Sequence, residues 1–126
     1  MLIDSSAWLE YCMGTKKGEM VRDIIESDDQ LFTSPVVLAE ICSKSVRTDG
    51  ADKADERTDF IARRCIMVGI GEDIGKNAGR LHAELRTKRK DFGMIDAIIL
   101  SSAIHKKARV VTCDSHFRDL DNVMML

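Results

Sequence analysis

Short apolar runs alternate along this chain with segments in which apolar residues recur at helical spacing. The runs predict strands, since each is brief and continuously apolar: MLI (1–3), LFT (31–33), IMVGI (66–70), RVVT (109–112) and NVMML (122–126). Strands of this kind, alternating with helices, are typical of parallel sheets covered on both faces. The pattern therefore predicts an α/β protein with three layers, α/β/α, around a mainly parallel central sheet.

The segments between these runs carry helix signals. After the first strand, Ser5 or Ser6 can cap a helix that continues through Tyr11 and ends at Gly14. Ser34 at the N-cap and Pro35 at the first helical position predict another start. Stripes with a helical period predict further helices: Met20–Ile25, a solvent-facing helix with Phe60, Ile61 and Cys65 on its apolar side, Ile74–Leu85, and the stretch GMIDAIILSSAI at 93–104.

Length and charge limit the possible functions. A chain of 126 residues predicts one domain, residues 1–126, with a single core. No apolar run approaches the about 20 residues of a membrane span, and the N-terminus has no basic leader, so we expect a cytoplasmic protein that does not contact membranes. The net charge is −2, so nucleic-acid binding requires a local basic patch.

The four cysteines predict free thiols. Cys12, Cys42, Cys65 and Cys113 match neither paired zinc-ligand spacing nor a redox Cys-x-x-Cys motif. We therefore expect them to be buried and unbridged.

Four carboxylates fall at positions that can meet at one end of the sheet. Asp4 and Asp114 follow predicted strands, and ligands of open parallel sheets bind beyond the carboxyl ends of strands. Asp96 lies in the first turn of an apolar helix, where the helix dipole favours an anion. Glu40 lies at the edge of an apolar helix face. Taken singly, each acid also suits a structural role as a turn, cap or solvated edge residue.

Taken together, the four acids form a cluster whose negative charge must be neutralised. Two carboxylates about 4 Å apart repel by about 4 kcal/mol at an effective dielectric near 20. Either some carboxylates hold protons, or a divalent cation neutralises the cluster. Oxygen ligands without nearby cysteine or histidine pairs favour Mg²⁺ or Mn²⁺, which suit phosphodiester hydrolysis.

A basic run precedes the helix of Asp96. Arg86, Lys88, Arg89 and Lys90 lie in LRTKRKDFG, and Arg63 and Arg64 form a smaller pair. Either group can be a phosphate-contacting patch or a solvated helix end.

Four sequence blocks, in order, resemble the PIN-domain nucleases, and within them the VapC-type ribonuclease toxins of toxin-antitoxin pairs. The blocks are LIDSSAWLEY with Asp4, SPVVLAEI with Glu40, DFGMIDAIILSSA with Asp96, and ARVVTCDSHF with Asp114. The resemblance spans essentially all 126 residues.

This resemblance implies a metal-dependent endoribonuclease. Asp4, Glu40, Asp96 and Asp114 would form the catalytic cluster, with Asp4, Asp96 and Asp114 holding Mg²⁺ or Mn²⁺ and Glu40 completing the cluster or positioning the attacking water. Products would carry 5′-phosphate and 3′-hydroxyl ends.

The resemblance also suggests supporting residues and partners. Ser6 and Thr112 look like the family's hydroxyl residues that hold the carboxylates. Some relatives carry a further acid where this chain has His116, which we expect to be a loop residue rather than a ligand. The implied partners are an RNA substrate, a second copy in a homodimer and a small antitoxin, and the basic run Arg86–Lys90 would contact RNA phosphates.

Other protein classes fit the residues less well. A receiver domain needs an acidic pair after its first strand, an Asp after its middle strand and a late Lys, whereas two serines follow Asp4 here. A haloacid-dehalogenase phosphatase needs Asp-x-Asp, and Ser6 occupies the second acidic position. A PIN-like binding module without catalysis, and a nuclease of RNA maturation, keep the same fold and remain open.

Overall fold

The fold is described from a computed structural model that covers all residues, 1–126. Its strands are β1 (Leu2–Ile3), β2 (Phe32–Thr33), β3 (Ile66–Met67), β4 (Val110–Thr112) and β5 (Val123–Met125). Its helices are α1 (Ser5–Met13), α2 (Lys16–Glu26), α3 (Pro35–Asp49), α4 (Ala51–Arg64), α5 (Glu72–Leu85) and α6 (Met94–His105), with a short 3₁₀ turn at Ser115–Phe117.

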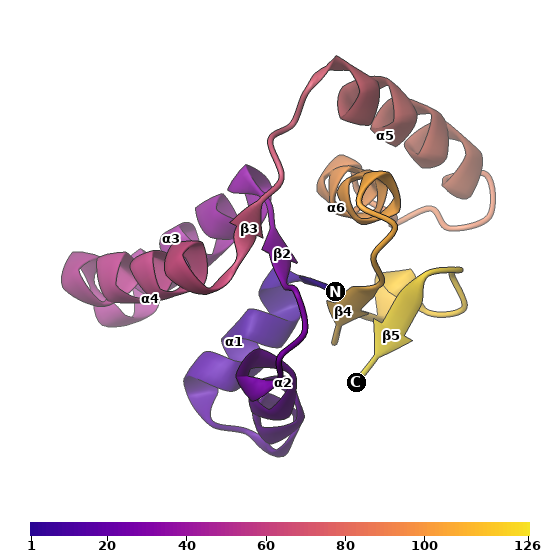
Figure 1. The fold of residues 1–126 in the computed structure, drawn as a ribbon. Helices are drawn as coiled ribbons and strands as arrows, with labels where there is room; N and C mark the ends of the chain where they lie inside the picture. Colours follow the sequence, from indigo (N-terminus) through magenta and orange to yellow (C-terminus); the bar gives the residue numbers. More distant parts are fainter.

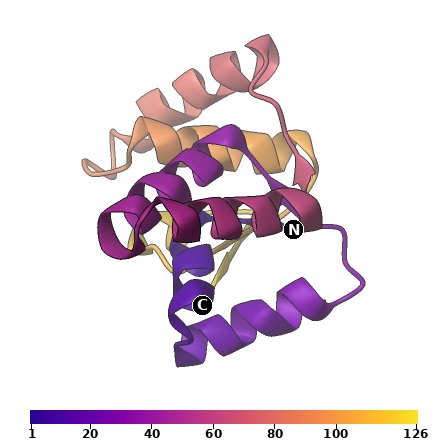
Figure 2. The same cartoon turned by 90° about the vertical axis from the view of Figure 1, so that its left-hand side faces the viewer.

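The five strands form one parallel sheet in the order β3-β2-β1-β4-β5. In Figures 1 and 2, the pair α1–α2 and the pair α5–α6 lie on opposite sides of this sheet, and the pair α3–α4 extends from the side of β2 and β3. The predicted three-layer α/β/α fold is therefore confirmed, and the sheet is wholly parallel. No helix in the structure is both long enough and apolar enough to span a membrane.

The strand order places a topological switch point between β1 and β4. From β1 the chain builds outward through β2 to β3 and then returns to the other side of β1 as β4. In open α/β sheets, ligands bind at such a switch point, beyond the carboxyl ends of the strands. Asp4 directly follows β1 and Asp114 follows β4 by two residues, so both predicted acids lie at this edge.

The core is built from the central strands and the inner faces of the helices. Leu2, Ile3, Val110 and Val111 are fully buried, as strands covered on both faces require. Helix α6 is buried along Ala97 and Ile99–Ala103 but exposes Met94, Ile95 and Ile104, so the helix predicted to be buried is buried on one side only.

Two helix caps differ from the prediction in their contacts. Helix α1 is capped by Asp4, whose carboxylate accepts from Ser6 N at 3.4 Å, rather than by a serine, and the helix runs to Met13 before the left-handed Gly14. Ser34 occupies the N-cap position of α3, but its hydroxyl is buried and makes no hydrogen bond within the protein.

The predicted strand 66–70 was too long. Only Ile66 and Met67 are strand, and both are exposed, because β3 is the sheet edge and pairs only with β2. Val68 still donates its N–H to Thr33 O at 2.8 Å before the chain leaves toward α5.

Candidate active site

Asp4 is the most tightly held of the four acids. Its side chain is only 3% exposed, and its Oδ2 accepts hydrogen bonds from Ser6 Oγ at 2.6 Å and from Thr112 Oγ1 at 2.8 Å. A buried carboxylate needs such donors, because burial without partners costs several kcal/mol. The two hydroxyl residues predicted to support the acids therefore both contact Asp4.

The same two hydroxyls also fix the chain where it leaves β4. The hydroxyl oxygens lie 3.0 Å apart, and each gives its single proton to Asp4. Ser6 Oγ in turn accepts from Cys113 N, and Thr112 Oγ1 accepts from Asp114 N, each at 3.0 Å. This arrangement, which we call the hydroxyl clamp (Ser6 and Thr112), couples the orientation of Asp4 to the backbone that presents Asp114.

Asp114 begins the 3₁₀ turn after β4. Its Oδ1 accepts from His116 N at 2.9 Å, and His116 Nδ1 lies 3.0 Å from the same oxygen. Arg89 Nη1 donates to the His116 carbonyl at 3.5 Å, a long hydrogen bond. His116 is therefore a turn residue whose ring contacts the Asp114 carboxylate.

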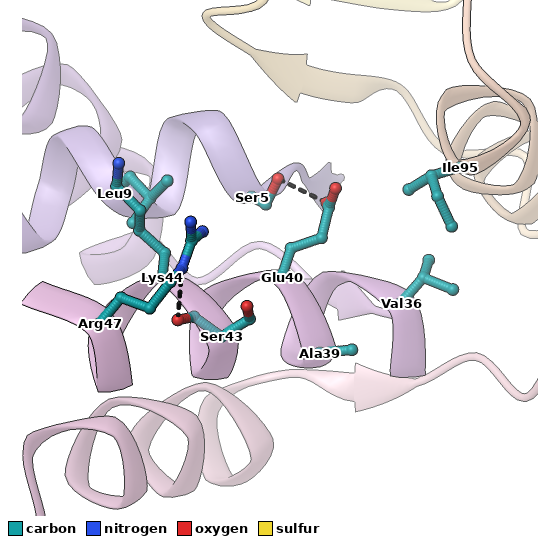
Figure 3. Close-up of a pocket in the computed structure, with 9 residues that line it drawn as sticks. All are labelled: Ser5, Leu9, Val36, Ala39, Glu40, Ser43, Lys44, Arg47 and Ile95. Atoms are coloured by element: carbon teal, nitrogen blue, oxygen red, sulfur yellow. Dashed lines mark hydrogen bonds between the residues drawn. The ribbon is translucent and has the colours of Figure 1, made fainter. Parts of the chain in front are cut away.

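Asp96 and Glu40 approach the same edge from two helices. Asp96 Oδ2 accepts from Gly93 N at 3.0 Å, so this carboxylate stabilises the first turn of α6 as a cap residue. Glu40 Oε2 accepts from Ser5 Oγ at 2.7 Å across the junction of α1 and α3, as Figure 3 shows. From the sequence, Ser5 was expected only to cap a helix, so this contact between residues 35 positions apart was missed.

The electrostatics bring all four acids into one group. Partial burial raises the pKa of Glu40, the hydrogen bond from Ser5 opposes this, and the charges of Asp4, Asp96 and Asp114 raise it further. Partial burial likewise raises the pKa of Asp96; the Gly93 N–H lowers it, and Asp114 and Asp4 raise it. No positive charge compensates that of Glu40, and His116 lowers the pKa of Asp96 as the last and smallest of its causes.

The residues fit a hard divalent cation in their chemistry. All four acids offer oxygen ligands, and their mutual repulsion would be relieved by a cation. No three His, Cys, Asp or Glu side chains lie close enough together to coordinate one ion directly. Mg²⁺ usually keeps several of its waters and binds through one or two carboxylates, so it does not require three direct ligands.

The predicted basic run lies between α5 and α6. Arg86, Lys88 and Lys90 are exposed, whereas Arg89 is half-buried and reaches the turn that carries His116. The structure therefore brings only Arg89 to the acidic edge. Arg64, from the smaller basic pair, has a structural role: its guanidinium donates to Ile25 O at 2.8 Å and Ser27 O at 2.9 Å, where α2 ends.

The cysteines are unbridged, as predicted. Only Cys65 is buried, while Cys12, Cys42 and Cys113 are half-buried, so the expectation of four buried thiols was wrong for three of them. None of the four lies in a metal-binding group.

The molecule is thus a parallel α/β/α sandwich with a group of acids at its switch point. The chain belongs to the PIN domain family, whose model matches residues 1–123. The resemblance drawn from the four sequence blocks is thereby confirmed at the level of the family. A search among curated proteins found no match to the sequence.

Solved structures with the same fold come from bacterial toxin-antitoxin systems. A toxin-antitoxin complex from Klebsiella pneumoniae is 18% identical, with a TM-score of 0.76, over 98% of this chain and 95% of that one. VapBC2 from Rickettsia felis, bound to a promoter DNA fragment, is 18% identical with a TM-score of 0.77, over 99% and 96%. VapC20 of Mycobacterium tuberculosis, a Sarcin-Ricin loop cleaving toxin, is 18% identical with a TM-score of 0.75, over 92% and 91%. These similarities establish the fold.

Proposed function

We propose that this protein is an endoribonuclease that hydrolyses RNA phosphodiesters with Mg²⁺ or Mn²⁺ and acts as the toxin of a toxin-antitoxin pair. The observation that carries the proposal is the electrostatic coupling of Glu40 and Asp96 to Asp4 and Asp114, four acids from separate stretches of the chain at one sheet edge. The similarity to an RNA-cleaving toxin supports RNA as the substrate.

In this proposal Asp4, Asp96 and Asp114 would together hold the ion, not all of them by direct contact, since Mg²⁺ keeps several of its waters. The chemistry that such an ion supplies is Lewis acidity, which makes water a stronger nucleophile and stabilises the charge of a departing oxygen. The hydroxyl clamp keeps Asp4 in one orientation and fixes the backbone of Asp114. Positioned ligands lower the barrier because they need not reorganise during the reaction.

Glu40 would orient the attacking water and accept its proton. Its raised pKa makes its carboxylate a better proton acceptor than an ordinary glutamate, and Ser5 fixes one of its oxygens while the other stays available. In-line attack on phosphorus would then leave a 5′-phosphate and a 3′-hydroxyl.

The proposed partners follow from the same similarity. Structures of toxin-antitoxin complexes share this fold, so we propose a small antitoxin as the protein partner. A homodimer is proposed on the family resemblance, and size-exclusion chromatography with light scattering tests it. We propose action in the cytoplasm, where RNA is available.

The test is cleavage of RNA by the purified protein with Mn²⁺, with EDTA, and as Asp96→Asn. We expect cleavage with Mn²⁺ and none in EDTA or in the folded variant. Asp73→Asn is the matched control, since Asp73 is an exposed acid in the first turn of α5 and should remain fully active. Cleavage that persists in EDTA, or in folded Asp96→Asn, would contradict the metal mechanism, and RNA binding without any cleavage would favour the binding-module alternative.

A further inference from the structure

A groove follows one face of α3 and passes Glu40. Its volume is about 490 Å³. Figure 3 shows Ser5 and Glu40 in its middle, Val36 and Ile95 toward α6, and Lys44 and Arg47 toward the other end. Leu9, Ala39 and Ser43 complete the lining. Because Glu40 lines the groove and belongs to the acidic group, the groove adjoins the acidic edge.

Two unpaired cations line the end of the groove away from Asp96. Neither Lys44 nor Arg47 takes part in an ion pair, although other lysines and arginines of α4 and α5 do. Arg47 Nε donates to Ser43 O at 3.2 Å, which directs part of the guanidinium along its own helix and leaves its terminal nitrogens available. Charged donors without a carboxylate partner are suited to an anionic ligand.

The spacing relates these cations to the acidic cluster. They follow Glu40 by four and seven positions, so all three side chains lie on one face of α3. With a rise of about 1.5 Å per residue, Lys44 is about 6 Å and Arg47 about 10 Å further along the helix axis than Glu40. The cations therefore form a short row that leads away from the acids.

We propose that Lys44 and Arg47 bind the phosphates next to the scissile one, so that the groove holds a single strand of RNA running along α3. This inference rests on the proposed nuclease function and assigns residues to the substrate. Arg89 would be a further cation for the same strand, because it lies by the His116 turn, beside Asp114 rather than beside α3. The strand would pass over the acidic edge between cations on two sides.

The groove lining indicates how this strand is recognised. Its apolar side chains are Leu9, Val36, Ala39 and Ile95, and none is aromatic. Base stacking on aromatic rings, which holds single strands in many proteins, is therefore absent from the groove. Recognition through phosphates fixes the position of a strand without reading its sequence. We therefore expect the residues that select the RNA target to lie outside this groove.

The test compares Lys44→Ala/Arg47→Ala with Lys106→Ala/Lys107→Ala. The control removes the same charge from two exposed lysines just after the C-terminal end of α6, opposite to the end that carries Asp96. Binding of a labelled single-stranded RNA of mixed sequence is measured in EDTA across a salt series. Each lost phosphate contact on a single strand lowers the log–log salt slope by about 0.7, so we expect the test variant to lose about 1.4 and to bind several-fold more weakly.

The outcomes separate this inference from the proposed function. Suppose that the wild-type protein cleaves RNA with Mn²⁺ and that the test variant matches it in salt slope and affinity for RNA. The proposed role of the groove would then be overturned, and the proposed nuclease function would stand. A failure of wild type to cleave any RNA would count against the nuclease itself. A poly-glutamate peptide provides the third arm: if it, and not RNA, binds in a manner that depends on Lys44 and Arg47, the groove accepts an acidic protein segment and the inference is wrong. Circular dichroism confirms that both variants are folded.

Discussion

Removing one charge from the acidic cluster should stabilise the protein when no metal is present. Asp96→Asn eliminates a carboxylate whose pKa is raised above its ordinary value of 3.8, first by partial burial and then by Asp114 and Asp4. The amide oxygen of Asn can still accept from Gly93 N, so the helix cap is retained. Because the raised pKa means that the folded state binds more protons, the wild type loses stability as pH rises from about 4 through the folded pKa.

The size of this gain follows from the charge repulsion. Two unit charges about 8 Å apart repel by about 0.5 kcal/mol in bulk water and about 2 kcal/mol at an effective dielectric of 20. Asp96 is half-exposed, so solvent screens part of this repulsion and we expect a gain of about 1 kcal/mol near pH 7. In a domain of this size, that corresponds to a rise in melting temperature of roughly 3 to 5 °C.

The assay is thermal unfolding in EDTA and in excess Mn²⁺, at several pH values. In EDTA, Asp96→Asn should melt above wild type at pH 7, and the difference should shrink toward pH 4, where the wild-type carboxylate gains its proton. With Mn²⁺ at about one hundred times its Kd, the wild type should gain about 2.7 kcal/mol, and Asp96→Asn should lose most of this gain.

A second variant separates charge from capping. Asp96→Ala removes the acceptor for Gly93 N as well as the charge, so it should melt below Asp96→Asn by the equivalent of about 1 kcal/mol. The reasoning would be refuted if Asp96→Asn melted below wild type in EDTA and responded to Mn²⁺ as strongly as wild type does.

Three further predictions concern the supporting structure. Thr112→Val keeps the shape of the side chain but removes the donor to Asp4 and the acceptor for Asp114 N. Urea unfolding should therefore show a loss of about 1.5 to 3 kcal/mol of stability, and RNA cleavage should fall. Thr112→Ser keeps the hydroxyl and should retain both the stability and the cleavage. Gly18→Ala would place a Cβ 2.2 Å from the Glu10 carbonyl oxygen, at the contact between α1 and α2, and should destabilise the folded protein by about 1 to 3 kcal/mol. As the control, Gly75→Ala meets no atom within 4 Å and should not destabilise the folded protein. Thiol labelling of the unfolded, unreduced protein should count four cysteines, and in the native protein Cys65 should react slowly, since burial raises its pKa to about 11; a count below four would contradict free thiols.

The fold could be predicted because its signals are local and agree with one another. Continuous apolar strands such as Val110 and Val111 indicated burial on both faces, and Pro35 and Gly14 marked helix ends where the structure has them. The length of β3 could not be predicted, because the apolar run at 66–70 does not reveal that this strand lies at a sheet edge with a single neighbour.

The candidate site could be predicted by residue type but not by contact. Asp4 and Asp114 each follow an apolar run, and this local pattern is sufficient to indicate the same sheet edge for both. The hydrogen bond from Ser5 to Glu40 depends on how α1 and α3 cross, and no local pattern encodes that crossing. Arg64 looked like a possible phosphate contact, yet its partners are carbonyl oxygens at the end of α2, which lie more than 30 positions earlier in the sequence.

The hydroxyl clamp also has a consequence during protein synthesis. Thr112 and Asp114 leave the ribosome long after Asp4, and they are separated from it by 108 residues or more. Until β4 has emerged and docked beside β1, Asp4 lacks the hydrogen bond from Thr112 and the acidic group lacks Asp114. A partly translated chain is therefore unable to assemble the proposed nuclease centre, so a ribosome producing this protein would not be exposed to its activity before nearly the whole domain has been made.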